Sequence, residues 1–341
     1  MSKATFFNKK KYFLSLKKKI KFHYKNCKEF KNLINNSNLK INNSKNIESL
    51  PFIHINNFKS NNLLSVSKKK VVTTLHSSGT TNSSKSKIFL DKSNVINQKK
   101  SLYNILCKSI TSKRLPMIIL DKNPSLIDKK LYSAKIAAIY GFSLIGRDYF
   151  YILNKNNSIN YNGLKKFISK HKNSKKILFG FTYEVYDILI NRLKIKNISL
   201  QNSVLIHGGG WKKMEQKKIN NYEFKKKIKA KYNINKIINY YGLVEQTGSI
   251  FLECYKCNHL ITNSYSDIII RKPNLNLCKE SEQGIVQILS SIPSSYPGNS
   301  IITEDLGLIK KNYCKYHQEY KSFLIKGRIK KVEVRGCSDA N

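Results

Sequence analysis

From Lys70 onward, short apolar segments alternate with longer amphipathic ones, and this alternation restricts the fold more than any other feature of the chain. Apolar runs of strand length lie at 117–120, 177–181 and 204–207, and helical patterns lie at 129–140 and 213–232. Strand–helix alternation predicts an α/β sheet that carries its sites at the carboxyl ends of the strands. After about residue 248 the pattern becomes richer in strands, which we expect at 249–253, 267–271, 285–289 and 323–334.

Residues 5–36 place apolar side chains among lysines, a pattern that predicts one or two basic amphipathic helices. Such helices could bind a membrane surface, but packing against the main domain is the favoured interpretation. The Asn/Ser-rich stretch 35–48 is expected to be a loop. We therefore expect a helical and loop segment at 1–69 that packs on a main domain at 70–341.

The chain carries 63 Lys and Arg against 20 Asp and Glu, a formal charge of +43 that would normally indicate a nucleic-acid or anionic partner. Only six of these cations are arginines, although the guanidinium fork is the usual group for contacting bases and phosphates. The lysines are spread along the whole chain beside abundant Asn and Ile, which is typical of an AT-rich coding bias. A basic nucleic-acid-binding protein is therefore a remote alternative, and we expect no nucleic-acid partner.

No stretch of the sequence approaches the roughly 18–20 apolar residues of a membrane span, so we expect no transmembrane segment. The N-terminus lacks the apolar core and the cleavage site of a secretory signal. Seven cysteines without regular spacing then indicate thiols or metal ligands rather than a disulfide framework. A cytoplasmic location is expected.

The segment His76-Ser-Ser-Gly-Thr-Thr-Asn-Ser-Ser-Lys85, entered by an expected strand at 68–76, has the composition of a loop that wraps a polyphosphate. Gly79 lets the backbone approach the oxygens, the hydroxyls donate hydrogen bonds, and Lys85 supplies a positive charge. It is not a Walker loop, because G-x-x-x-x-G-K-[ST] is absent. A Ser/Thr-rich surface loop is the alternative interpretation.

Four downstream segments add groups that suit a nucleotide. Residues 204–211 run as a strand into three glycines, against whose bare backbone a planar ring or a phosphate could lie; a tight turn is the alternative. In Tyr241-Gly242-Leu-Val-Glu245 the ring could stack on a purine and the carboxylate could hold a hard cation, or they could be a core tyrosine and a solvated glutamate. Asp305 stands before an expected turn, where it could hold a ribose diol, and a strand ending in Arg328 would place a cation nearby.

In this order, the segments resemble the adenylate-forming superfamily, whose members activate carboxylic acids with ATP through T-S-G-T-T-G-x-P-K, a glycine-rich segment, Y-G-x-T-E, T-G-D and G-R-x-K. A closer resemblance is to the LuxE-like acyl-protein synthetases. It is carried by His-Gly-Gly-Gly-Trp-Lys at 207–212, Tyr-Gly-Leu-Val-Glu-Gln-Thr-Gly-Ser-Ile at 241–250 and Arg-Gly-Cys-Ser-Asp at 335–339. Residues 26–30, 51–52 and 58–59 are also similar to that family, so the resemblance covers nearly the whole chain.

Four positions depart from the superfamily pattern. Asn82 replaces a glycine but tolerates positive φ, and Ser84 replaces a proline, which leaves the loop less rigid. Val244 replaces a threonine, which removes one hydrogen bond worth about 1 kcal/mol. Glu304 replaces a glycine and adds negative charge near the expected ribose site.

The resemblance implies an α/β fold, the large N-terminal domain of an adenylate-forming enzyme, with mixed sheets flanked by helices and a β-rich C-terminal part. It implies this domain without the usual C-terminal lid. It also implies ATP and Mg²⁺ as cofactors, with Lys85 and Glu245 as catalytic residues and Glu245 as the Mg²⁺ ligand. The ATP-binding residues that it implies are Ser77, Ser78, Gly79, Thr80 and Thr81 at the phosphates, Gly208, Gly209, Gly210, Tyr241 and Gly242 at adenine, and Asp305 and Arg328 at the ribose.

By the same resemblance, a fatty or other carboxylic acid forms acyl-AMP, and Cys337 then accepts the acyl group as a thioester. A reductase or acyltransferase is the implied protein partner. Two alternatives stay open: Cys337 is a buried inert cysteine, or the enzyme is an acid–thiol ligase that delivers acyl-AMP to coenzyme A or a carrier protein.

The remaining cysteines include two groups with metal-ligand spacing. Cys254, Cys257 and His259 form one group, and Cys314 begins the second, Cys-Lys-Tyr-His. Thiolate and imidazole at these spacings suit a structural Zn²⁺. Ordinary buried thiols are the alternative interpretation.

Overall fold

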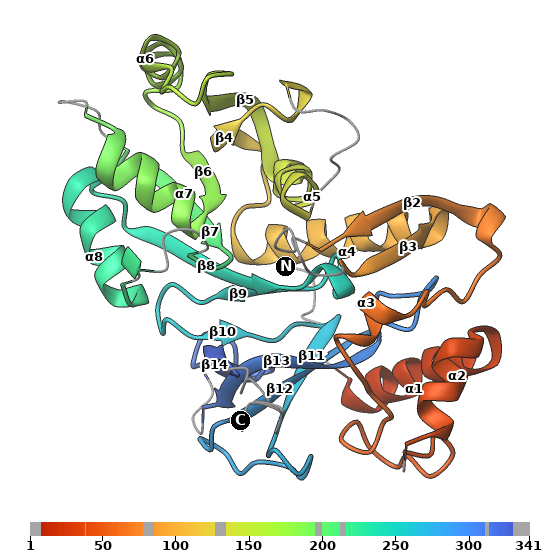
Figure 1. Cartoon of the computed structure of the whole chain (residues 1–341). Coiled ribbons are helices and arrows are strands. Elements are labelled where there is room, and N and C mark those ends of the chain that lie inside the picture. The colour runs from red at the N-terminus through yellow and green to blue at the C-terminus, as the bar shows by residue number, and fades with distance from the viewer. Residues whose placement is uncertain are drawn as a thin grey trace, which may run out of the picture.

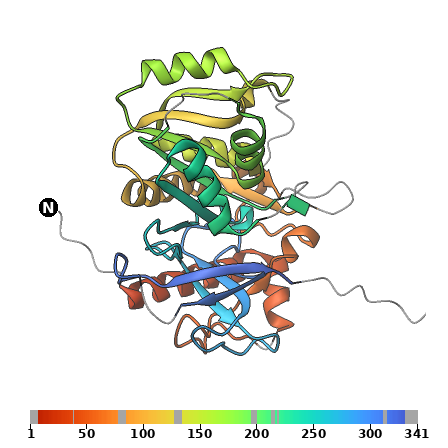
Figure 2. The same cartoon turned by 90° about the vertical axis from the view of Figure 1, so that its left-hand side faces the viewer.

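The computed structural model describes residues 8–37, 39–77, 85–126, 134–194, 200–211, 216–217, 219–310 and 314–329. Its main feature is a twelve-stranded sheet with the order β11-β12-β13-β14-β10-β9-β8-β7-β6-β4-β5, and β1 pairs with β13 beside this path. Figures 1 and 2 show the parallel strands and their helices in the upper half, and β11 to β14 with α1 and α2 in the lower half. The expected α/β class is confirmed.

The upper half contains five strands that are parallel to one another. They are β4 (Leu115–Lys122), β5 (Gly146–Leu153), β6 (Lys176–Phe181), β7 (Ser203–Gly208) and β8 (Lys236–Gly242). Alternate residues of a strand face opposite sides, so Ile118 and Leu120 pack into one hydrophobic core and Met117 and Ile119 into another. Helices cover both faces, which explains why β4, β6 and β7 are nearly continuous apolar runs in the sequence, whereas the edge strand β5 is partly exposed.

The helices of this half are α4 (Lys92–Ser109), α5 (Ala134–Phe142), α6 (Tyr161–Lys170), α7 (Thr182–Val185), which continues as a π-helical turn (Tyr186–Arg192), and α8 (Asn221–Tyr232). The helix expected at 213–232 begins later because the Asn220 side chain accepts a 2.9 Å hydrogen bond from the Glu223 amide and caps α8. The helix expected at 129–140 is α5, and residues 127–133 lie outside the described part of the chain.

The lower half is rich in strands, as expected after residue 248, and these strands pair antiparallel; the strand at 300–309 was not expected. Its strands are β9 (Ile250–Glu253), β10 (Leu260–Ile261), β11 (Ser266–Arg271), β12 (Gly284–Ser290), β13 (Ser300–Ile309) and β14 (Ser322–Arg328). The expectation of a turn beside Asp305 is wrong, because Asp305 lies inside β13. Pairing with β12 on one side and β14 on the other keeps this segment extended, and the register shifts between Leu306 and Gly307.

The expected N-terminal helices are α1 (Lys9–Asn26) and α2 (Lys28–Asn35). Their buried side chains share a hydrophobic cluster with Leu289 and Ile301 of the antiparallel half. The short strand β1 (Ile53–His54) pairs in parallel with β13, and α3 (Asn57–Ser60) follows it. The boundary between 69 and 70 stays a prediction. Among the described residues, no helix has the length and apolar character needed to cross a membrane.

Candidate active site

The carboxyl ends of the parallel strands form one edge of the sheet, and the expected glycine turn lies there. Gly208 ends β7 and pairs with Tyr240 of β8. A β-carbon on Gly208 would lie 2.5 Å from the Tyr240 ring and 2.7 Å from its backbone oxygen, so this close approach requires glycine. Gly209 has φ of +77°, whereas a β-carbon on Gly210 would meet no atom of the described residues within 4 Å. Gly210 therefore leaves open backbone at this edge.

His207 and Trp211 anchor the two ends of the glycine turn. His207 is buried, its Nδ1 lies 3.1 Å from the Thr182 hydroxyl, and its ring lies 4.4 Å from that of Phe224. Burial, with the charge of Lys225, lowers the pKa of His207 to about 3, so the imidazole is neutral. Trp211 packs edge-on against Tyr186. The His-Gly-Gly-Gly-Trp string thus owes its outer residues to packing.

Tyr241, Asp305 and Arg328 form one network across three strands. The Tyr241 hydroxyl donates a 2.6 Å hydrogen bond to Asp305 Oδ2, and Arg328 Nε lies 3.1 Å from Asp305 Oδ1. Asp305 is buried, while 76% of the Arg328 side chain is exposed. Burial and the Asp305 carboxylate raise the pKa of Tyr241, which keeps its hydroxyl protonated as a donor.

Glu304 points away from this network because neighbouring residues of a strand face opposite sides. Its Oε1 accepts a 2.8 Å hydrogen bond from Asn56, between β1 and α3. The negative charge that the sequence places beside Asp305 therefore contacts the N-terminal segment.

Glu245 lies in a 3₁₀ turn (Val244–Gln246) after β8 and is buried. Burial raises the pKa of its carboxyl group, and the side chain of Ser86 lowers it in part. Ser86 also joins the hydroxyl-rich segment, since its amide donates a 2.9 Å hydrogen bond to Ser77 Oγ and its backbone oxygen accepts from the Ser77 amide. The base of the hydroxyl-rich segment and the Tyr-Gly-Leu-Val-Glu element therefore meet at Glu245.

The turn that carries Glu245 is fixed to the antiparallel half. The buried Gln246 amide donates hydrogen bonds to the backbone oxygens of Ile288 and Gly298, at 3.1 and 2.8 Å. Thr247 donates a 2.6 Å hydrogen bond to Gln98 of α4. These bonds give a structural role to two residues that the sequence analysis used only as part of a resemblance.

Lys59 of α3 is a site residue that the sequence analysis missed. Its charge, like that of Arg328, lowers the pKa of Glu245 against the effect of burial. Lys59 Nζ also donates a 2.8 Å hydrogen bond to Asn56, the partner of Glu304. The Phe-Lys pair at 58–59 was its only sequence signal.

Several expected site residues fall outside the described residues: Ser78, Gly79, Thr80, Thr81 and Cys337. Lys85 is described and exposed, one residue before Ser86. Gly242 ends β8 next to Tyr241. The roles of all these residues stay predictions.

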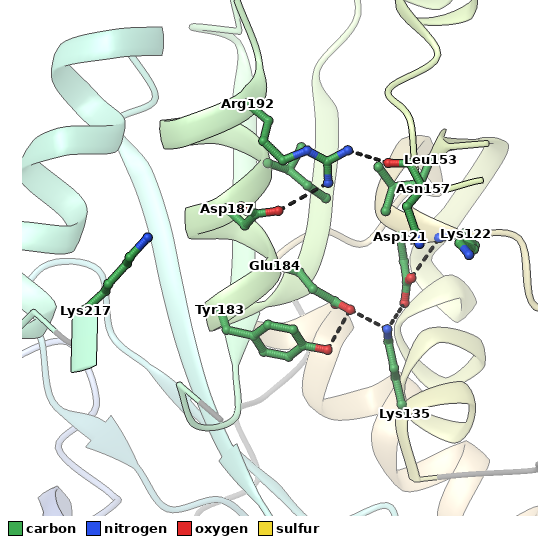
Figure 3. A pocket seen from close by; sticks show the side chains of 11 residues that line it. Asp121, Lys122, Lys135, Leu153, Asn157, Tyr183, Glu184, Asp187, Arg192 and Lys217 are labelled. Atoms are coloured by element: carbon green, nitrogen blue, oxygen red, sulfur yellow. Dashed lines mark hydrogen bonds and ion pairs between the residues drawn. The ribbon is translucent and has the colours of Figure 1, made fainter. Parts of the chain in front are cut away.

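A cavity of about 720 Å³ lies farther along the same edge, beyond the ends of β4 and β6. Figure 3 shows Lys135 of α5 between Asp121 and Glu184, with the Tyr183 hydroxyl directed at Glu184. Lys135 Nζ lies 2.7 Å from Asp121 Oδ2 and also pairs with Glu184. These residues were not among the candidates expected from the sequence, although Asp121 directly follows an apolar run of strand length.

Three of the cysteines with metal-ligand spacing also meet. The sulfur atoms of Cys254, Cys257 and Cys314 lie within 4.8 Å of one another. This group, as found in the described residues, does not contain His259.

The family model for the acyl-protein synthetase LuxE matches residues 5–341, almost the entire chain. The chain belongs to the LuxE family. The resemblance of the three quoted strings is thereby confirmed.

A curated relative of this LuxE-family chain is the long-chain-fatty-acid–luciferin-component ligase of Aliivibrio fischeri. The two are 25% identical over 164 residues, which make up 46% of this chain and 43% of the relative. The match thus spans less than half of the length of that protein.

Solved structures place the LuxE-family chain in the adenylate-forming fold. The crystal structure of 2-hydroxyisobutyryl-CoA ligase with 2-HIB-AMP and CoA matches with a TM-score of 0.71 and 9% identity, over 94% of this chain and 69% of that one. The amide bond synthetase McbA from Marinactinospora thermotolerans matches with a TM-score of 0.51 and 11% identity, over 76% of this chain and 49% of that one. The expected fold is confirmed.

Proposed function

We propose that this LuxE-family chain activates a carboxylic acid with ATP to form acyl-AMP, and then passes the acyl group to a cysteine thiol. The convergence of Glu245 with Ser77 and Ser86 on one side, and of Tyr241 with Asp305 and Arg328 on the other, carries the proposal. These groups lie far apart in the sequence and correspond to the phosphate, adenine and ribose segments of the family pattern.

In the first step a carboxylate oxygen attacks the α-phosphorus of ATP, and pyrophosphate leaves. Two anions must approach each other, so the site has to supply positive charge and alignment. Among the described residues, Lys59 and Arg328 place positive charge near Glu245, and Lys85 lies at the loop base. Asp305 would accept hydrogen bonds from the ribose, and the backbone of Gly210 would lie against adenine.

One observation supports the proposal that the site could hold Mg²⁺, namely the buried carboxylate of Glu245. Its carboxylate is buried, and burial raises its pKa, so a bound cation would stabilise its ionised form. Magnesium would neutralise phosphate charge there. The Glu245 side chain would hold it, and Ser86 would orient the carboxylate.

In the second step the sulfur of Cys337 would attack the acyl carbon, a thioester would form, AMP would leave, and the thiol proton would pass to solvent. Arg335, two residues away, would favour the thiolate. The name of the Aliivibrio fischeri relative supports a fatty acid as the substrate. A reductase or acyltransferase would take the acyl group from the thioester.

ATP–pyrophosphate exchange over a panel of carboxylic acids tests the first step, and absence of exchange with every acid would overturn it. Incubation with ATP and labelled acid tests the second step. We expect label that stays on the protein until hydroxylamine is added and that is lost in Cys337→Ser. Exchange with no protein-bound label, and formation of acyl-CoA when coenzyme A is present, would instead support an acid–thiol ligase.

A further inference from the structure

Three cysteines that are far apart in the sequence meet at one point of the antiparallel half. Cys254 follows β9, Cys257 lies in the turn before β10, and Cys314 lies before β14. All three are free thiols, and Cys254 and Cys314 are buried. Their sulfurs lie within 4.8 Å of one another, and the Cys254 and Cys314 sulfurs are 3.7 Å apart.

This spacing is too long for a disulfide and matches the edge of a zinc tetrahedron. A disulfide joins its sulfurs at about 2.05 Å. Zinc binds thiolate at about 2.3 Å in tetrahedral geometry, which separates two coordinated sulfurs by about 3.8 Å. The observed 3.7 Å leaves room for one ion between Cys254 and Cys314.

Two backbone hydrogen bonds close the β9–β10 turn around the first two cysteines. The Asn258 amide donates a 2.8 Å hydrogen bond to the Cys254 backbone oxygen, and Asn258 has φ of 57°. The Cys254 amide donates a 2.9 Å hydrogen bond to the His259 backbone oxygen. The closed turn holds Cys257 beside Cys254, so that both sulfurs reach the same point as that of Cys314.

We infer that Cys254, Cys257 and Cys314 bind a structural Zn²⁺ through their thiolates, and that one imidazole supplies the fourth ligand. Three thiolates and one imidazole are a usual closed zinc set. Each thiol releases a proton when it binds the ion, and no oxidation is involved.

Two histidines can supply the imidazole. The register Leu260↔Glu253 places His259 opposite Cys254, so both side chains stand on the same face of the hairpin. His317 follows Cys314 by three residues, and its amide donates a 2.8 Å hydrogen bond to the Cys314 backbone oxygen. In the described residues neither imidazole belongs to the sulfur group, so one ring must rotate to complete the tetrahedron.

The ion would connect two strands that frame the Tyr241–Asp305–Arg328 network. β9 pairs with β8, which carries Tyr241, and β14 carries Arg328 and pairs with β13. A zinc bridge between Cys254 and Cys314 would close a loop of sixty residues between these strands. Its effect would be on folding stability, because binding of a structural metal adds to the free energy of unfolding.

Metal analysis of the full chain, purified without chelator and without an immobilised-metal column, tests the inference directly. We expect about one zinc per chain in wild type and a large loss of zinc in Cys257→Ser. Cys278→Ser is the matched control, since Cys278 is also partly exposed in the antiparallel half and contacts Gln283. Zinc below a tenth of the protein concentration in wild type, or equal zinc in wild type and Cys257→Ser, would overturn the inference.

His259→Ala and His317→Ala identify the imidazole. After replacement of zinc by Co²⁺, the variant that has lost the ligand should show altered visible bands, while the other variant keeps the wild-type spectrum. Wild-type spectra in both variants would overturn the imidazole assignment. Because metal content is measured without substrates, failure of the zinc inference is distinguishable from failure of the proposed adenylation.

Discussion

The hydroxyl of Tyr241 donates a 2.6 Å hydrogen bond to the carboxylate of Asp305, which is 64 positions away in the sequence. The same carboxylate pairs with Arg328 at 3.1 Å. One bond from tyrosine and one from arginine leave the Asp305 side chain little freedom to rotate. Asp305, which we propose contacts the ribose, is therefore held in place before any nucleotide binds. This lowers the entropy cost of binding.

Tyr241→Phe tests this positioning. Removal of one hydrogen bond to a charged group costs about 1.5–3 kcal/mol, so we expect KM for ATP to rise about tenfold or more while kcat changes little. Tyr240→Phe is the control, because the Tyr240 ring packs in the core against Phe142. Steady-state ATP–pyrophosphate exchange measures both constants. An unchanged KM together with a lower melting temperature would show that the bond is only structural.

Glu245→Gln should separate stability from activity. Burial raises the pKa of Glu245 above its ordinary 4.5, so the folded chain binds this proton more tightly than the unfolded chain. The protonated Glu245 carboxyl group therefore contributes fully to stability below pH 4.5. This contribution is lost as the pH rises through the higher pKa of the folded state. Without nucleotide, we expect the variant to melt above wild type at neutral pH and to lose this advantage toward pH 4.5.

The same variant should lose about a hundredfold or more of exchange activity, since the proposed metal ligand is neutralised. Glu280→Gln, an exposed glutamate with the same change of charge, is the control. Calorimetry from acid to neutral pH measures the stability difference. Parallel pH profiles for wild type and Glu245→Gln would contradict the assignment.

Gly208→Ala and Gly210→Ala form a matched pair in one turn. At position 208 the new β-carbon would lie 2.5 Å from the Tyr240 ring, which forces a shift that costs about 1–3 kcal/mol. At position 210 it would meet nothing within 4 Å in the part of the chain that the structure describes, so stability should stay near that of wild type. If adenine lies against this backbone, Gly210→Ala should still weaken ATP binding. Urea unfolding and nucleotide titration measure the two effects, and equal stability of both variants would refute the packing argument.

Lys135→Met, at the cavity shown in Figure 3, should lower the stability of the folded protein. It removes the cation between Asp121 and Glu184, whose side chains are only 8% and 11% exposed. Removal of one partner from a buried ion pair lowers the free energy of unfolding by about 3–5 kcal/mol. We expect a loss of about 3 kcal/mol here, because 26% of the Lys135 side chain is exposed to water. The double variant Lys135→Met, Glu184→Gln should recover part of the loss in chemical denaturation. No recovery would mean that the destabilisation does not come from uncompensated charge.

Local pattern was sufficient for the parallel strands β4, β6 and β7 and for the helices of the N-terminal segment, but it did not predict β5 and β8. The run at 117–120 is apolar on both faces because two separate cores bury its alternate residues. The same local logic failed at Asp305, where Asp-Leu-Gly resembles a turn. The strands before and after it in the chain hydrogen-bond that segment and keep it extended. Leu306 pairs with Ile285 and Asp305 pairs with Arg328, and the local Asp-Leu-Gly string does not include these partners.

For the candidate site, too, some features could be recognised from the sequence and others required the tertiary structure. The order of its motifs, and therefore the family, could be recognised from the sequence, because each motif is a short string whose residues are adjacent. The approach of Lys59 and Ser86 to Glu245 and the hydrogen bond from Asn56 to Glu304 were decided only by the tertiary structure. Spacing made Cys254, Cys257 and Cys314 metal-ligand candidates, but only the tertiary structure shows that their sulfurs meet. Strand register and long loops bring such residues together, and a sequence contains no local signal for a contact between segments that are 60 or more positions apart.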